Sequence, residues 1–221
     1  MNGYLWQMLL GTVLTLQLAL SAFVIGSLLG LFAAFLEASS NRFLRRLTSF
    51  FIFILRALPE ILILFFIYFG LTTGLSEISQ GYINISPFIA GCSTLSLIFS
   101  AYASQVFRSA FLSIHEGQLH AAQAFGFTTA QVFLKIKIPQ AFRHALPGLG
   151  NLWLVLIKDT AIVTLIGLSD LMNQARMAAA STQDPFTFYF IAACIYLLIT
   201  TISQTMFSLY GKHLSQGQRH D

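Results

Sequence analysis

Four charged residues lie inside long apolar stretches of the sequence, where charge is rare and therefore informative. Arg56 and Glu60 occur in one such stretch, and the adjacent residues Lys158 and Asp159 occur in another. A charge near the middle of a bilayer costs about 2.5–3.5 kcal/mol on insertion scales, so such residues pair with one another or face a water-filled cavity. Carboxylates and cations in such a cavity can bind the opposite charges of a small zwitterion through charge-assisted hydrogen bonds.

A proline separates the first two charges. Arg56 and Glu60 are four residues apart, so a continuous helix would place them on one face. Pro59 between them removes a backbone hydrogen bond, and irregular backbone at membrane depth is tolerated where it is buried or lines a cavity. We therefore predict a substrate site here; the alternative is a structural ion pair that locks two spans together.

The second charged pair leaves two roles open. Lys158 and Asp159 are adjacent, so their side chains point about 100° apart on a helix. One of them can face a cavity while the other contacts a neighbouring helix, and a structural role for either is an equal alternative.

The composition indicates whether these residues lie in a membrane or in water. Apolar residues make up 56% of the 221 residues and charged residues only 9%, against about 25% charged in soluble domains. Mean hydropathy is +0.75, which indicates an integral membrane protein and excludes soluble enzymes and nucleic-acid-binding modules. We expect Cys92 and Cys194, both in apolar runs, to be small buried hydrophobic residues without a disulfide.

Several chemical functions have no support in the sequence. The chain contains no G-x-x-x-x-G-K-[ST] run for binding ATP, and no histidine lies in an apolar stretch to serve an intramembrane hydrolase. His115 and His120 are five residues apart, which does not suit a helical zinc site, so we expect no metal. The charges must therefore serve binding or structure.

The charged residues divide the chain into predicted helical spans. We expect an all-α integral membrane protein with a single domain, 1–221, and a long polar loop at 112–146. Five helices are predicted, at roughly 11–36, 48–74, 88–111, 147–169 and 187–210.

Loop charges predict the orientation of these spans. Lys and Arg gather in the 37–47 loop, in the 112–146 loop and in the C-terminal tail, whereas Glu77, Asp170 and Asp184 lie in the other connections. The positive-inside rule then places the N-terminus outside and the C-terminus in the cytoplasm, as an odd number of spans requires.

The long polar loop carries helix signals of its own. Residues 116–125 favour a helix that stops at Gly126, a natural C-terminal cap. Thr128 and Gln131 fit a capping box that opens a second helix, which we expect to end before Pro139. Two short helices joined at a glycine predict a docking element; a surface hairpin that merely links two spans is the alternative.

The spacing of residues in this loop resembles the cytoplasmic signature of ABC-importer permeases. That signature reads Glu-Ala-Ala, three residues, Gly, nine residues, Ile-x-Leu-Pro; here His120 replaces the Glu and Ile138 the Leu. The resemblance implies a coupling helix that docks into a cleft of an ATP-hydrolysing subunit. Its candidate coupling residues are His120, Ala121, Ala122, Gly126, Ile136 and Pro139.

Two further segments extend the resemblance over most of the chain. Residues 55–60 resemble the Arg-Gly-x-Pro motif of permeases for polar amino acids, with Ala57 in place of the glycine, and residues 145–160 resemble permeases for arginine and other basic amino acids. The resemblance implies a type I ABC-importer permease fold in the bacterial inner membrane. This chain would then be a transporter subunit and not an enzyme.

The resemblance also implies partners. It predicts two ABC ATPase subunits that hold ATP and Mg²⁺, a second permease subunit in a homodimer or heterodimer, and a periplasmic or lipid-anchored amino-acid-binding protein. Membrane lipid surrounds the chain; no cofactor in this chain and no nucleic acid is expected.

A basic amino acid, arginine above all, is the predicted substrate. We expect Arg56 to bind the substrate carboxylate, and Glu60 with Asp170 to bind its cationic end, because Asp170 would give the site an acidic surplus. Lys158 and Asp159 complete the candidate site. A permease for glutamine, cystine or another neutral amino acid, or a stand-alone channel or carrier, is the alternative.

Overall fold

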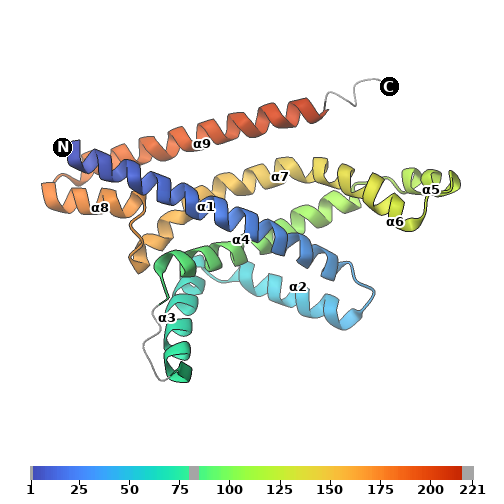
Figure 1. Cartoon of the computed structure of the whole chain (residues 1–221), viewed down its shortest axis with the longest axis horizontal. Helices are drawn as coiled ribbons and strands as arrows, with labels where there is room; N and C mark the ends of the chain where they lie inside the picture. The colour runs from blue at the N-terminus through green and yellow to red at the C-terminus, as the bar shows by residue number, and fades with distance from the viewer. Residues whose placement is uncertain (1, 80–84, 216–221) are drawn as a thin grey trace.

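The protein is all helical throughout the residues that its computed structural model describes, 2–79 and 85–215 (Figure 1). Of the two C-terminal cations that entered the predicted orientation, Lys212 lies in the last C-terminal helix and Arg219 lies outside the described residues. The α-helices are α1 (Asn2–Glu37), α2 (Arg42–Ala57), α3 (Glu60–Ser79), α4 (Pro87–Leu112), α5 (Glu116–Ala124), α6 (Thr129–Val132), α7 (Ile138–Asp159), α8 (Leu171–Thr182) and α9 (Pro185–Ser215). A π-helical turn, Phe133–Lys137, joins α6 to α7, and a 3₁₀ segment, Thr160–Ile166, follows α7.

The long apolar helices match the predicted spans in position. Within the described residues, four helical segments are long and apolar enough to cross a membrane, and a bent pair of helices makes up to five. The bent pair is α2 and α3, which meet at 106°. The irregular backbone predicted at Pro59 within the 48–74 span is therefore confirmed, because Leu58 adopts an extended conformation before Pro59, as residues that precede proline prefer.

The centre of the bundle is the packing of α1 against α4, which lie side by side (Figure 1). Glycines allow this close approach: a Cβ atom at Gly26 would lie 2.9 Å from the carbonyl oxygen of Ser96, and one at Gly30 would lie 2.9 Å from that of Ser100. Helix α8 packs between the N-terminal parts of α1 and α9, around the buried residues Met8 and Leu171.

The polar segment after Gly126 continues into the next apolar stretch as one long helix. From Thr129 to Ile166 the chain stays helical over 38 residues, so the prediction that the second loop helix ends before Pro139 is wrong. In the π turn, the backbone N–H of Ile138 bonds to the carbonyl of Phe133. Pro139, which has no backbone N–H to donate, follows directly after this π turn, where the regular α-helical bonding pattern is already interrupted.

The two cysteines differ in their surroundings. Both are unpaired, as predicted, and Cys92 is buried in the core. Cys194 is exposed, so its expected burial is wrong: α9 packs against the bundle along one side, and Cys194 lies on the other.

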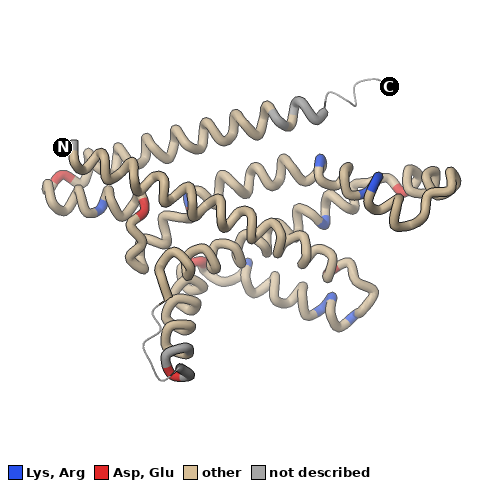
Figure 2. Tube along the Cα trace, viewed as in Figure 1, with Lys and Arg blue, Asp and Glu red and all other residues tan. Residues whose placement is uncertain are grey.

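Basic residues gather at one end of the molecule. Figure 2 shows Lys and Arg mainly toward the ends of α2, α4 and α7 that lie nearest α5 and α6. The opposite end, with α8 and the starts of α1 and α9, carries Asp170, Asp184 and Arg176. This asymmetry agrees with the loop charges from which the orientation was predicted.

Candidate functional site

The break at Pro59 separates the two charges that flank it. Arg56 lies in the last turn of α2 and Glu60 is the first residue of α3, on the far side of the 106° bend. The predicted shared helix face is therefore wrong. The Arg56 guanidinium lies 5.3 Å from the ring centroid of Tyr102 on α4, a cation–π distance.

Glu60 and Asp159 line one cavity, although they are 99 positions apart in the sequence (159 − 60). The cavity has a volume of about 240 Å³ and lies between α4, α7 and the start of α3. Ligand pockets commonly measure roughly 300–1,000 Å³, so this space suits a small ligand. Its lining consists of Glu60, Leu95, Ile98, Phe99, Tyr102, Leu152, Val155, Leu156 and Asp159.

The cavity is acidic and lacks a compensating cation in its wall. Both carboxylates are partly buried among apolar side chains, and no lining residue in the described chain is Lys or Arg. Glu60 lies at the N-terminus of α3, where the helix dipole favours a negative charge. Asp159 lies inside the continuous helical segment Thr129–Ile166, so no helix N-terminus stabilises its charge.

The alternative of a locking ion pair has no counterpart in the described residues. There, no Lys or Arg nitrogen lies within 4.0 Å of a carboxylate oxygen of Glu60 or Asp159. The four intramembrane charges therefore do not neutralise one another by contact.

Lys158 points away from the acidic cavity. It lines a separate space of about 410 Å³ beside α9, together with Tyr196 and Thr200. This divergence from Asp159 is the one expected for neighbouring residues on a helix.

Asp170 does not join Glu60, although the sequence predicted that the two would act together. It is fully buried as the N-cap of α8, where its Oδ1 accepts hydrogen bonds from Thr164 Oγ1 at 2.6 Å and from the backbone N–H of Asn173 at 3.0 Å. Burial raises the pKa of this carboxyl, and these hydrogen bonds act in the opposite direction. The acidic partner of Glu60 across the cavity is Asp159 instead.

Tyr102 is the residue at this site that sequence reasoning missed. It lines the cavity and also lies under the guanidinium of Arg56, so it connects the two sides of the helix break. Its polar hydroxyl in an apolar span was the available signal, but the small polar residues of α4 carry the same signal at several other positions.

The docking segment forms a second candidate site at the basic end. Helix α5 ends in a Schellman motif, in which the N–H of Phe127 bonds to the carbonyl of Ala122 at 3.1 Å. Gly126 has φ of +87°, the left-handed conformation predicted for a cap. The predicted capping box is confirmed, with Thr128 and Gln131 each bonding the backbone of the other.

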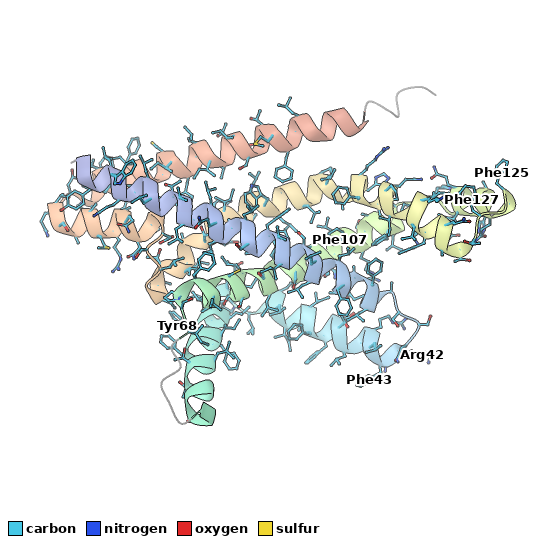
Figure 3. All side chains as sticks on the ribbon, viewed as in Figure 1. Arg42, Phe43, Tyr68, Phe107, Phe125 and Phe127 are labelled. Carbon is cyan, nitrogen blue, oxygen red and sulfur yellow. The ribbon has the colours of Figure 1, made fainter. Side chains whose placement is uncertain are left out.

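Aromatic side chains project from the turn between α5 and α6, residues 125–128, which is named the docking tip. Figure 3 places Phe125 and Phe127 at the far end of the molecule, beyond the rest of the bundle. Phe125 is 85% exposed, and an exposed aromatic side chain on a rigid projection is typical of a docking surface. Of the predicted coupling residues, His120, Ala121 and Pro139 are exposed, Ile136 is half-buried, and Ala122 is buried beneath the tip.

Comparisons with known proteins place the whole chain in one group. Residues 26–216 match the model of the family described as binding-protein-dependent transport system inner membrane component. The chain is 45% identical to the arginine ABC transporter permease protein ArtQ of Haemophilus influenzae, over 92% of this chain and 91% of that protein. It is 36% identical to the histidine/lysine/arginine/ornithine transport system permease protein HisQ of Escherichia coli, over 97% of this chain and 96% of that protein.

Solved structures agree with the helical arrangement. A crystal structure of an amino acid ABC transporter with histidines superposes with a TM-score of 0.86 at 34% identity, covering 96% of both chains. The inward-facing MetNI methionine ABC transporter superposes with a TM-score of 0.75 at 17% identity, over 96% of this chain and 98% of that one, which shows the shared fold.

Proposed function

The chain belongs to the family of binding-protein-dependent transport system inner membrane components, and on that premise we propose that it carries a basic amino acid, arginine first, across the membrane. It is a permease subunit of an amino-acid ABC importer, with the type I fold, in the bacterial inner membrane. We propose in addition which substrate it carries, which residues bind that substrate, and which helix couples binding to ATP hydrolysis.

One observation carries the choice of a cationic substrate. Glu60 and Asp159 line the same cavity, and no basic residue lines it with them in the described chain. Two carboxylates in a small apolar space repel each other and lose solvation, so a ligand cation is favoured because it relieves both costs. A guanidinium is well suited, since it donates hydrogen bonds to two carboxylates in one plane.

The remaining charges have assignments that follow from position. Arg56, beside the cavity across Tyr102, is placed to attract the substrate carboxylate. Lys158 faces α9 and Asp170 caps α8, so the proposed substrate site consists of Arg56, Glu60 and Asp159. A neutral amino acid such as glutamine or cystine would leave the two carboxylates without a cation.

Coupling is proposed to run along the helix that joins the two candidate sites. The Thr129–Ile166 segment begins beside the docking tip and passes Asp159, a distance of roughly 45 Å at 1.5 Å per residue. We infer that the tip docks on an ATPase subunit, which holds ATP and Mg²⁺, and that a displacement there moves Asp159 relative to Glu60. This chain binds no ATP in the proposal.

The other partners in the proposal are those that the family resemblance predicts. A second permease subunit, identical or related, encloses the path, and a periplasmic or lipid-anchored binding protein delivers substrate. The N-terminus is proposed to lie outside and the docking tip in the cytoplasm, with the bent α2–α3 pair as one of five spans.

The decisive experiment compares substrates in the reconstituted importer. Glu60→Gln should lower the apparent affinity for arginine roughly 10- to 100-fold in arginine-stimulated ATPase assays, because a charge-assisted pair contributes about 1.5–3 kcal/mol and 1.4 kcal/mol is a factor of ten. Asp159→Asn should act in the same direction.

A matched control separates binding from folding. Glu77→Gln removes an exposed carboxylate from the other end of α3 and should leave arginine affinity unchanged. If Glu60→Gln instead reduced assembly and transport equally for arginine and glutamine, a structural role for Glu60 would replace the proposed one.

A further inference from the structure

A further charged cavity lies at the basic end of the bundle, apart from the acidic cavity and beside the docking segment. It has a volume of about 410 Å³ and opens between the end of α1, the start of α2, the end of α4 and the π turn. Its lining consists of Ala34, Phe35, Glu37, Ala38, Arg45, Arg108, Phe111, Leu112, Phe133 and Lys137.

Three cations in this lining have no side-chain partner among the residues that the structure describes. Among the described residues, Arg45, Arg108 and Lys137 form no ion pair or side-chain hydrogen bond. The one carboxylate, Glu37, is buried and already bonded, by Ser49 Oγ and Gln105 Nε2 at 2.9 Å each. The cavity lining therefore carries a net positive charge that residues 2–79 and 85–215 leave uncompensated.

An apolar wall stands beside these cations. The rings of Phe35, Phe111 and Phe133 form one cluster, with centroid separations of 5.4 Å, 5.9 Å and 6.4 Å. Leu112 extends the apolar surface and is 75% exposed. A ligand that fills this cavity needs an anionic group beside a hydrocarbon part.

We propose that this cavity binds the headgroup phosphate of an anionic phospholipid, with an acyl chain along the aromatic wall. Basic pockets between membrane helices near the cytoplasmic surface are suited to acidic lipid headgroups, and the cytoplasmic leaflet supplies such lipids. A free phosphate shares the anionic chemistry but would leave the aromatic wall uncovered. The proposal does not depend on the substrate, but it does rest on the proposed orientation.

The position of the cavity gives the lipid a mechanical role. Lys137 and Phe133 belong to the π turn of the long segment Thr129–Ile166, the coupling helix of the proposed function, whereas Arg45 lies on α2 and Arg108 on α4. A bound headgroup bridges these three elements and holds the coupling helix against the bundle. Occupancy should therefore raise substrate-stimulated ATP hydrolysis without changing which amino acid is preferred.

The test uses the complete importer in nanodiscs with a graded fraction of phosphatidylglycerol in phosphatidylethanolamine. Retained phosphatidylglycerol is counted by native mass spectrometry, and arginine-stimulated ATPase activity is measured in parallel. Each of Arg45→Gln, Arg108→Gln and Lys137→Gln should weaken lipid retention about fivefold, because one cation near an anionic lipid is worth about that factor. The fraction of phosphatidylglycerol that gives half-maximal arginine-stimulated ATPase activity should rise as retention weakens.

Arg46→Gln is the matched control, since Arg46 neighbours Arg45 on α2 but does not line the cavity. It should retain phosphatidylglycerol like the unmodified chain. Equal retention by all three single variants, or no specific lipid in the intact complex, would overturn the proposal. Displacement of phosphatidylglycerol by millimolar inorganic phosphate would assign the cavity to free phosphate instead and equally overturn it.

Discussion

The acidic cavity and the docking tip differ in how the protein builds them. The tip consists of residues within one short stretch, and its conformation comes from hydrogen bonds between near neighbours, such as those of Thr128 and Gln131. The cavity joins a helix break on one side of the bundle to the end of α7 on the other. Changes at the tip should therefore alter coupling for every substrate alike, whereas changes at the cavity should alter the choice of substrate.

The largest expected effect tests whether the two regions face different compartments as proposed. In a chain with Cys92→Ala and Cys194→Ala, a membrane-impermeant thiol reagent added outside should label Glu77→Cys fully. It should not label Ser40→Cys or Arg143→Cys, which lie toward the basic end. Gel-shift labelling in intact cells and in inverted vesicles measures this.

Labelling of Ser40→Cys from outside would reverse the orientation. The docking tip would then lie on the side opposite to a cytoplasmic ATPase, and the proposed coupling role of the tip would be wrong.

A tenfold effect is expected at the glycine of the tip. Gly126→Trp forces a bulky residue into a left-handed conformation, which costs about 1–2 kcal/mol, or roughly 5- to 30-fold in the population of the docking conformation. Arginine-stimulated ATP hydrolysis should fall by about that factor, while the affinity for arginine stays unchanged.

Gly126→Asn provides the control, because asparagine tolerates the left-handed conformation better than other residues with a side chain. It should retain most of the activity. Unimpaired transport by Gly126→Trp would show that the tip is not the docking surface.

The smallest effect is expected at the capping box. Thr128→Ala removes the cap of α6 and should destabilise the start of the coupling helix by about 1 kcal/mol, which lowers stimulated hydrolysis about fivefold. Thr128→Ser keeps the hydroxyl and should behave like the unmodified chain. A change in the ratio of arginine to lysine transport in Thr128→Ala would contradict the separation of the two regions.

The sequence was sufficient to predict the tip because its signals are local. Gly126 adopts a left-handed conformation that glycine reaches without a steric cost, and Thr128 bonds a residue three positions away. Local signals also predicted the long apolar helices, since each must cover the membrane by itself. They failed at Pro139, where a π turn absorbed the proline without ending the helix.

The sequence predicted residues of the acidic cavity but not which of them share it, because residues far apart in the sequence come together only in the folded chain. Glu60 and Asp159 were both candidates, but nothing local to either indicates that they share a cavity. Asp170 was paired with Glu60 on total charge, whereas its carboxylate caps α8. The proline was noticed, but the size of the bend depends on how α3 packs against α4 after the break.

The π turn at Phe133–Lys137 also affects the direction in which the docking tip faces, relative to the direction in which Asp159 faces, about the axis of the long helix. Such a turn holds one residue more than a regular α-helix of the same length, and each residue of an α-helix turns the chain by about 100°. Deletion of a single residue here would restore an ordinary helix. Because the π turn already accommodates that residue, the deletion would leave the docking tip at nearly the same angle about the helix axis that carries Asp159. A deletion in the regular part of α7 would instead rotate the tip by about 100°.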